Sequence, residues 1–350
     1  KNLKEKMWKK NRINYLNILY FEFFFSFILG CLLSIANPPI SFPYIVIVVL
    51  AIFSYSWFKK RPSYKKAFLL GFLFGFGYFT LSLLWIVEPF LIESNKSFIF
   101  APFALFLLSA LLSSFWGTAF LLSSYKDDYR NKLKSFLKLT VFFSLAEYLR
   151  SILFTGFPWA LLSLAFIETP VSQTLSIFGP YWLTFIIIFL SFIIPFGMNG
   201  IIISICGFII LNLYGMDRYH SVENKIPNKI VRIVQPNIFQ KDKWKSNLSE
   251  KHFSKLIKLS NENADTVDII IWPETAVPFF LEFKKDFQKN FSNKIKKQVI
   301  LGARRYDKDT NEIFNSAYFL NNNGEIQQIY DKKHLVPFGE YIPIIDLINI

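Results

Sequence analysis

Long apolar stretches alternate with short charged clusters over the first 215 residues of the chain. Seven of these stretches approach the length that an α-helix needs to cross a bilayer, although the second and the seventh are short. We expect them at residues 18–36, 44–58, 67–87, 98–125, 135–154, 171–196 and 201–214. The pattern therefore predicts a transmembrane bundle of about seven helices over residues 1–215.

Glycine and proline predict two features inside these stretches. Gly71, Gly75 and Gly77 lie in the third stretch, where the lack of side chains lets a neighbouring helix approach closely. Gly179 and Pro180 interrupt the sixth stretch, where we expect an irregular helix.

The pattern after Tyr214 is that of a soluble domain. A polar linker at 216–228 precedes short apolar runs that alternate with amphipathic segments. We expect strands at 229–235, 267–272 and 298–302, helices at 247–263 and 283–297, and a hairpin of 317–320 with 325–330 around the turn 321–324. This order predicts a layered α/β sheet over 229–350.

Charge sets the expected orientation. The net charge of +14 would suggest nucleic acid in a soluble protein, but much of it lies in short clusters between apolar stretches, so we expect no nucleic-acid partner. The N-terminus, 59–66 and 126–134 are rich in Lys and Arg, whereas 37–43 and the loop around Glu93 are not. The positive-inside rule then predicts a cytoplasmic N-terminus and a periplasmic domain after residue 214.

Two cysteines, Cys31 and Cys206, both lie in apolar stretches. We interpret them as small buried hydrophobic side chains and expect neither a disulfide nor a catalytic thiol from them. The sequence predicts no metal site and no cofactor. The chain starts at Lys1 and stops at Ile350 within what reads as a continuing domain, so we expect it to be a fragment.

The candidate chemistry centres on Glu274, in VDIIIWPETAVP, and Lys332, in YDKKHLVPFGEYIP. A strand that stops at a proline can place Glu274 at the edge of a sheet, and Lys332 follows a predicted strand and precedes an apolar run. A Glu and a Lys in one apolar pocket are unfavourable unless each has a use. In acyl transfer the carboxylate can deprotonate a thiol and the ammonium can stabilise an oxyanion.

Four motifs in order resemble the apolipoprotein N-acyltransferase family. They are AEYLRSILFTGFPW at 146–159, VQPNIFQKDKW at 234–244, IIIWPETAVP at 269–278 and YDKKHLVPFGEYIP at 330–343. The resemblance covers nearly all of the chain. It implies a transmembrane bundle joined to an α/β nitrilase-like domain, an α-β-β-α sandwich that is incomplete in this chain.

The resemblance also implies roles for individual residues. Glu274 would be the general base and Lys332 the oxyanion-stabilising member of a Glu–Lys–Cys triad. Glu340 would be a supporting carboxylate, Trp244 matches a tryptophan implicated in activity, and Asn315 matches an asparagine near the pocket.

The reaction implied is acyl transfer in two steps at the bacterial inner membrane. A cysteine takes the sn-1 acyl chain of a phospholipid, typically phosphatidylethanolamine, and passes it to the α-amine of the diacylglyceryl cysteine of an apolipoprotein. In the family this cysteine and a last transmembrane helix lie downstream of PFGE, whereas the chain ends ten residues after Glu340. We therefore expect this chain to be inactive on its own.

Three residues in or just after the fifth stretch can be interpreted in two ways: the pair Glu147 and Arg150, and Trp159. Glu147 and Arg150 are spaced to share one helix face, where they either neutralise each other or let Arg150 hold a lipid phosphate and shape the opening of the site. Trp159 is either part of a membrane-level loop or an interfacial anchor. Two alternatives to the acyltransferase are a membrane-tethered nitrilase-type amidase and a non-catalytic membrane binding protein.

Overall fold

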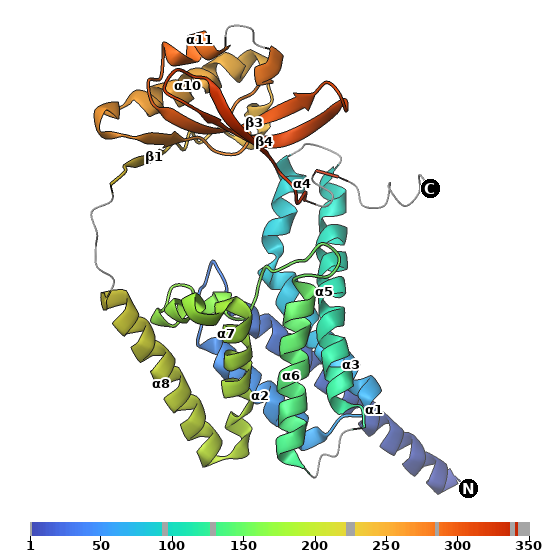
Figure 1. Ribbon diagram of the computed structural model, residues 1–350. Helices are drawn as coiled ribbons and strands as arrows, with labels where there is room; N and C mark the ends of the chain where they lie inside the picture. The colour runs from blue at the N-terminus through green and yellow to red at the C-terminus, as the bar shows by residue number, and fades with distance from the viewer. Residues whose placement is uncertain are drawn as a thin grey trace. The chain divides into compact units, whose positions relative to one another are not determined.

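The computed structural model describes residues 2–92, 97–126, 131–221, 228–283, 287–336 and 340–341. These residues belong to two compact units, which divide between Glu223 and Asn224 (Figure 1). Parts of several predictions lie outside the described residues: the loop at 93–96, the basic loop at 127–130, the linker at 222–227, and the motif positions 337–339 and 342–343.

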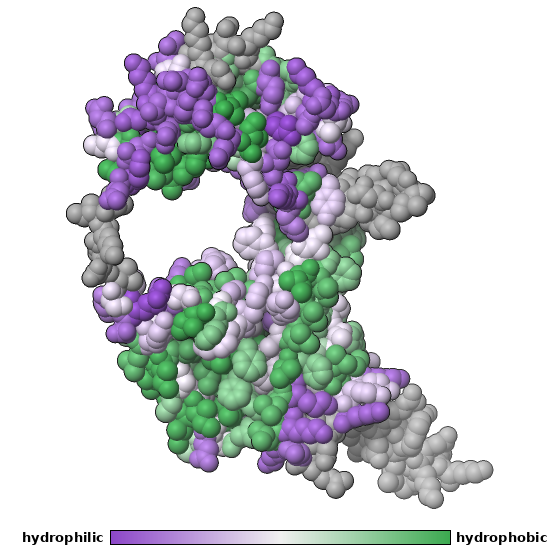
Figure 2. All heavy atoms as spheres, viewed as in Figure 1, coloured by the Kyte–Doolittle hydropathy of each residue, from purple (hydrophilic) through white to green (hydrophobic). Residues whose placement is uncertain are grey.

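Helices make up the first unit, and each of the seven predicted apolar stretches contains one. The helices are α1 (Asn2–Leu33), α2 (Ile45–Lys60), α3 (Tyr64–Ser82), α4 (Glu88–Ile92), α5 (Ala101–Ser124), α6 (Lys132–Arg150), α7 (Leu175–Phe192) and α8 (Met198–Ser221). Figure 2 shows apolar side chains over most of the visible face of this unit, as a bundle surrounded by lipid requires.

Four helical stretches among the described residues are long and apolar enough to cross a membrane. They are Asn17–Ala36, Phe98–Ser124, Pro170–Phe196 and Met198–Ser221. Tyr64–Ser82 and Leu84–Leu91 form a fifth candidate that bends by 59° between them. α2 has only 16 residues, and α6 carries three lysines besides Glu147 and Arg150. The helical bundle is confirmed, while the number of its spans stays a prediction.

Close helix packing through glycine is confirmed. A Cβ atom on Gly71 would overlap the Phe120 ring of α5, and one on Gly77 would overlap the Phe27 carbonyl of α1. α3 therefore lies against both α1 and α5 at positions that admit no larger residue. The predicted irregularity of the sixth stretch is also confirmed, because Gly179 has a φ of 78° inside α7.

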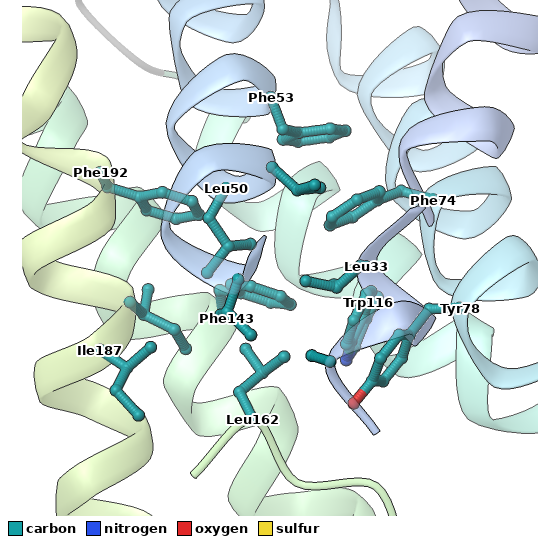
Figure 3. Close-up of a cluster of buried hydrophobic side chains, with 14 of the residues drawn as sticks. Leu33, Leu50, Phe53, Phe74, Tyr78, Trp116, Phe143, Leu162, Ile187 and Phe192 are labelled. Atoms are coloured by element: carbon teal, nitrogen blue, oxygen red, sulfur yellow. The ribbon is translucent and has the colours of Figure 1, made fainter. Parts of the chain in front are cut away.

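Aromatic rings fill the centre of the first unit (Figure 3). The Trp116 ring of α5 lies 5.3 Å from the Phe74 ring, 5.2 Å from the Tyr78 ring and 4.8 Å from the Phe143 ring, measured between centroids. Leu162, from the loop after α6, closes one side of this cluster and is fully buried. Side chains from three helices and a loop thus share one core.

Two predictions for the first unit are corrected. α8 starts at Met198 and ends at Ser221, whereas 201–214 was expected, because Gly197, with a φ of 91°, reverses the chain in a single residue. Residues 216–221 of the predicted linker are therefore helical. Cys206 is exposed and Cys31 is half-buried, so neither is the buried side chain that we expected.

A mixed five-stranded sheet forms the centre of the second unit. The strands are β1 (Val231–Ile233), β2 (Ile269–Ile271), β3 (Gln298–Asp307), β4 (Glu312–Leu320) and β5 (Ile326–Asp331), and the helices are α9 (Gln240–Lys243), α10 (Ser249–Asn261) and α11 (Phe287–Ser292). The strands lie in chain order, with β1, β2 and β3 parallel and β4 and β5 antiparallel to their neighbours. The predicted hairpin is the β4–β5 pair.

Helices cover one face of this sheet. Leu256 of α10 and Phe291 of α11 belong to the same buried cluster as Ile270, Val299 and Leu301 of the strands. On the opposite face the side chain of Ile233 is 78% exposed. The described residues thus hold one sheet and one helical layer, which is half of the predicted α-β-β-α sandwich.

Two elements of the second unit differ from their predictions. The helix expected at 283–297 is reduced to α11, because Ile295 turns into the core and the chain then enters β3. β3 continues to Asp307 and β4 begins at Glu312, so a second hairpin with its turn at 308–311 precedes the predicted one. The charged side chains between the two strands and at their ends gave this segment the hydropathy of a loop, so these parts of the strands were not predicted.

Candidate functional site

Glu274 lies at the top of a turn that is held to β3 on both sides. Before the turn, Trp272 N–H donates to the Ile300 carbonyl at 2.8 Å, and after it Val277 N–H donates to the Gly302 carbonyl at 3.2 Å. The Trp272 indole also donates to Ser260 of α10 at 2.9 Å. These bonds fix where the Glu274 backbone can lie.

Gly302 allows this turn to lie directly over the strand. A Cβ atom at this position would lie 2.5 Å from the Pro273 carbonyl and 2.7 Å from the Glu274 Cα. These distances are shorter than van der Waals contact, so any larger residue would push the turn away.

Lys332 follows β5 and is fixed by its own backbone. Its N–H donates to the Asn315 carbonyl of β4 at 2.9 Å, which continues the β4–β5 ladder by one residue. The ladder therefore places the Lys332 and Asn315 side chains at the same end of the sheet as the Glu274 turn.

Four polar side chains meet at this end of the sheet. The Lys332 ammonium lies 3.3 Å from Glu274 Oε1 and 2.9 Å from Glu340 Oε2. The Asn315 side-chain amide donates to Glu274 Oε1 and, at 3.0 Å, to Glu340 Oε1. Both bonds to Glu274 use the same oxygen, so Oε2 of Glu274 has no partner among the residues described. We call Glu274, Asn315, Lys332 and Glu340 the carboxylate cluster.

Glu340 also bonds to the chain beside it. Its Oε2 accepts from the Val336 N–H at 2.8 Å, and its own N–H donates to the Val336 carbonyl at 2.9 Å. Burial alone would raise the pKa of the Glu340 carboxyl, but the hydrogen bonds from Val336, Asn315 and Lys332 together lower it below its ordinary value. Glu340 is therefore a carboxylate at neutral pH.

Lys332 stays protonated for the same reason. The hydrogen bond to Glu340 is the largest cause that raises the pKa of the Lys332 amine, and Glu274 adds to it, while burial opposes both. An amine with a raised pKa already carries its proton at neutral pH, so it acts as a cation and cannot accept a further proton. The geometry therefore suits Lys332 to stabilising negative charge and leaves Glu274, with its free oxygen, to accept a proton.

The cluster is open to solvent, which corrects the apolar pocket expected for Glu274 and Lys332. The side chain of Glu274 is 64% exposed and that of Lys332 30%. Both line a depression of about 330 Å³ with Trp272, Gly302, Ala317 and Tyr330. The helices of this unit cover the other face of the sheet, so no described element of the second unit closes over the site.

Trp244 lies beside the Glu274 turn because Lys243, the preceding residue, bonds to that turn. The Lys243 ammonium donates to Thr275 Oγ1 at 2.7 Å and to the Glu274 carbonyl at 3.3 Å. It also lies over the Trp244 ring, as does the guanidinium of Arg304 from β3. Burial lowers the pKa of the Lys243 amine, and the nearby Glu274 charge opposes this effect.

Arg305 supports the site from the helix-covered face of the sheet. Its guanidinium donates to both carboxylate oxygens of Asp331, at 3.0 and 2.9 Å, and to Asp307 at 3.1 Å. Ser316 Oγ donates to the same Asp331 at 2.6 Å. Asp331 directly precedes Lys332, so this clamp fixes the strand end from which the ammonium projects.

Glu147 and Arg150 form a fully buried pair in the first unit. The guanidinium donates to both Glu147 oxygens, at 2.7 and 3.0 Å, and to the carbonyls of Phe157, Trp159 and Ala160. These bonds use all five N–H groups of Arg150, whose side chain is fully buried. No donor is left for a lipid phosphate, so of the two interpretations the geometry favours the self-neutralising pair.

Trp159 belongs to the loop that Arg150 holds. Its carbonyl accepts from the Arg150 guanidinium at 2.8 Å, while its indole ring is exposed and packs edge-on against Trp85 at 5.4 Å. An exposed pair of indole rings is what an interfacial anchor requires, and the role of Trp159 stays a prediction.

The site thus unites most of the predicted residues and adds three that the sequence reasoning missed: Lys243, Gly302 and Arg304. Lys243 lies in the motif that contains Trp244, and Gly302 ends a predicted strand. The sequence therefore contained features that could have indicated both residues. In the part of the chain that the structure describes, no three His, Cys, Asp or Glu side chains come together as a metal site would need.

Comparisons with known proteins match both units. Residues 29–193 match the family model of the apolipoprotein N-acyltransferase N-terminal domain, and residues 230–346 match that of carbon-nitrogen hydrolases. The second match spans all the strands and the whole carboxylate cluster.

Curated relatives extend the match over most of the chain. An apolipoprotein N-acyltransferase of Brucella suis is 30% identical over 349 residues, which are 91% of this chain and 65% of the relative. Those of Sinorhizobium fredii and Rickettsia bellii are 30% and 31% identical over 93% and 81% of this chain. The chain spans only 66% and 59% of the length of these two relatives.

Proposed function

Because the chain belongs to the apolipoprotein N-acyltransferase family, we propose that its second unit carries the base and the oxyanion-stabilising cation of an acyl-transfer site. The observation that carries this proposal is the carboxylate cluster: Glu274 keeps one oxygen free, and Lys332 is held protonated beside it. The donor proposed is a phospholipid, typically phosphatidylethanolamine, and the acceptor is the α-amine of a diacylglyceryl cysteine at an apolipoprotein N-terminus.

In the first step Glu274 takes the proton of a cysteine thiol, and the thiolate attacks the sn-1 ester carbonyl. Lys332 stabilises the oxyanion of the tetrahedral intermediate, which collapses to a thioester as the protonated Glu274 gives its proton to the departing alkoxide and the lysophospholipid leaves as an alcohol. In the second step the acceptor amine attacks the thioester, Glu274 takes its proton, and the thiol is restored. Glu340 and Asn315 position Lys332 and Glu274 throughout.

The proposed thiol is neither Cys31 nor Cys206, because both lie in apolar helices and the family resemblance gives neither of them the role of the nucleophile. We therefore propose that these residues alone form no acyl-enzyme. The bundle would hold the site at the outer face of a bacterial inner membrane, since exposing acyl chains to water costs about 0.8 kcal/mol for each methylene.

The test uses the protein with a site cysteine in place. Transfer of a labelled sn-1 chain from phosphatidylethanolamine to a diacylglyceryl peptide is measured for wild type, Glu274→Gln and the matched control Glu312→Gln, which alters an exposed carboxylate at the start of β4. We expect Glu274→Gln to lower the rate by about 10²- to 10⁴-fold and Glu312→Gln to leave it unchanged.

The same assay separates the alternatives. A membrane-tethered amidase would release its acyl product into water without needing the peptide acceptor. A non-catalytic binding protein would give no labelled product, and its function would survive Glu274→Gln. Either result would contradict the proposed transfer.

A further inference from the structure

Arg304 lies on the open face of the sheet beside the carboxylate cluster. It is the register partner of Asn315, whose amide binds both Glu274 and Glu340. It also lies two residues along β3 from Gly302, over which the Glu274 turn passes. Two strand residues span about 7 Å, so the Arg304 backbone is about that far along the strand from the turn.

Aromatic rings orient the Arg304 side chain. Its Cζ atom lies 4.6 Å from the centroid of the Trp244 ring and 4.9 Å from that of the Phe280 ring. A guanidinium stacked on rings keeps its N–H edge available for a ligand in the ring plane. Arg304 is therefore held in place without using its hydrogen-bond donors.

The unused donors distinguish Arg304 from the other described arginines that are buried or half-buried. Arg150, Arg232 and Arg305 each donate at least two hydrogen bonds to carboxylates or carbonyls. Within the described residues, Arg304 has ring contacts and neither a hydrogen bond nor an ion pair. A half-buried, oriented guanidinium beside a candidate active site needs an acceptor from elsewhere.

The charges around the cluster favour an anion. Lys332 is neutralised by Glu274 and Glu340, whereas the Lys243 ammonium bonds only to neutral oxygens, those of Thr275 and the Glu274 backbone. Lys243 and Arg304 both lie over the Trp244 ring. Trp244 thus contacts two cations, neither of which forms an ion pair with a described carboxylate, although the Glu274 charge lies near Lys243.

We propose that Arg304, with Trp244 and Lys243, forms a subsite for a phosphodiester anion. A guanidinium fork binds two phosphate oxygens at once, and Lys243 adds a second positive charge. The assignment rests on the proposed function, in which the donor is a phospholipid. A phospholipid carries both the sn-1 ester and the phosphate on one glycerol backbone, so a single molecule has the groups for both the proposed acyl-transfer site and this subsite.

Phosphorus NMR of the full 350-residue chain in a maltoside detergent, which contains no phosphorus, tests the subsite. The probes are dihexanoyl phosphatidylethanolamine and inorganic phosphate, titrated separately against wild type, Arg304→Gln and Arg304→Lys. Lys255→Gln is the matched control, because it removes the same charge from an exposed site on α10, the helix on the other face of the sheet.

We expect the lipid phosphate to bind wild type and Lys255→Gln with the same Kd. Arg304→Gln should raise that Kd about tenfold or more, since a hydrogen-bonded charge pair is lost, and Arg304→Lys should fall between them. Inorganic phosphate should bind far more weakly. If Arg304→Gln does not fold, as its thermal unfolding would reveal, Arg304→Lys decides, and an unchanged Kd in that variant overturns the subsite.

The other outcomes separate this inference from the proposed function. Equal lipid binding by all four proteins would overturn the Arg304 assignment and leave the phospholipid donor intact. No lipid binding even by wild type would contradict the donor itself. Inorganic phosphate that binds as tightly as the lipid, with the same dependence on Arg304, would mean a free-phosphate site and overturn the headgroup assignment.

Discussion

Two pairs of a glutamate and a cation occupy opposite environments in this chain. In the first unit the side chains of Glu147 and Arg150 are 1% and 0% exposed, and every N–H of the guanidinium has an acceptor. In the second unit the side chain of Glu274 is 64% exposed, and one of its oxygens has no partner among the described residues. Each pair combines one negative and one positive charge. Only in the second pair does a carboxylate oxygen lack a partner among the described residues.

The difference separates a structural pair from one that we propose to be reactive. A buried charge must have its bonding capacity filled, because an unmet donor or acceptor is strongly destabilising. A site that performs chemistry must instead keep one group unpaired for the substrate. Burial and saturation together indicate that Glu147–Arg150 holds the loop at 157–160, whereas Glu274–Lys332 is available for proton transfer.

A third pair lies between these extremes. Arg305 and Asp331 have side chains 19% and 33% exposed, and their bidentate contact holds the end of β5 from which Lys332 projects. If burial decides how much a pair contributes to folding, breaking the three pairs should give graded losses of stability. The predictions below run from the largest expected effect to the smallest.

Arg150→Met should destabilise the protein the most, by about 3–5 kcal/mol, because Glu147 is left charged and unpaired in a dry interior. The free energy of unfolding is measured by denaturant titration in detergent. Lys332→Met is the matched control, since it breaks a more exposed pair, and we expect it to lower stability by less than about 1 kcal/mol. Similar losses in the two variants would contradict the division between structural and reactive pairs.

Gly302→Ala should lower the rate of acyl transfer by about 10- to 100-fold in the protein with its site cysteine in place. The added Cβ would displace the Glu274 turn, and a shift of about 1 Å in a catalytic group can reduce a rate by that much. Rates are compared per folded molecule.

A second glycine provides the control for Gly302→Ala. Gly324 has a φ of 73° in the β4–β5 turn, so Gly324→Ala strains the backbone away from the site. It should reduce stability and leave the rate unchanged. A folded Gly302→Ala variant with the wild-type rate would show that the turn is not positioned by this glycine.

Asp331→Asn should lower stability by about 1 kcal/mol, less than Arg150→Met and more than Lys332→Met, and the loss should be visible mainly as a change in acid stability. Hydrogen bonds from Arg305 lower the pKa of the Asp331 carboxyl below its ordinary value, although burial opposes them. The stability from this group is therefore complete above pH ~4 and is lost as pH falls through the lowered folded-state pKa. Wild type should lose stability more steeply than Asp331→Asn below pH ~4, and parallel curves would contradict the clamp.

The sequence predicted where the candidate site residues lie better than it predicted their surroundings. Glu274 follows a strand that ends at proline, and Lys332 follows the second strand of a hairpin, so strand periodicity placed both at strand ends. The resemblance added Asn315, Glu340 and Trp244. The first three strands, the β4–β5 hairpin and the helical bundle followed from hydropathy and from the residues of the turns, whereas the parallel pairing of the strands was not predicted.

What the sequence could not predict depends on contacts between distant residues. The strands around 303–316 carry several charged residues, of which Arg305 pairs with Asp331 on β5, so their hydropathy resembled that of a loop. The acceptors of Arg150 are loop carbonyls seven to ten residues away, which no helix spacing reveals. The site is open to solvent because the helices of this unit cover the opposite face of the sheet, and the sequence pattern does not show which face they cover.

The central claim is that the exposed pair performs chemistry and the buried pair maintains the fold. The most direct test measures the rate per folded molecule and the free energy of unfolding for Glu274→Gln and Glu147→Gln together. We predict that Glu274→Gln loses at least about 10²-fold in rate with little change in stability, and that Glu147→Gln loses stability while its folded molecules keep the wild-type rate. A Glu274→Gln protein that still transfers acyl chains at the wild-type rate would contradict the account.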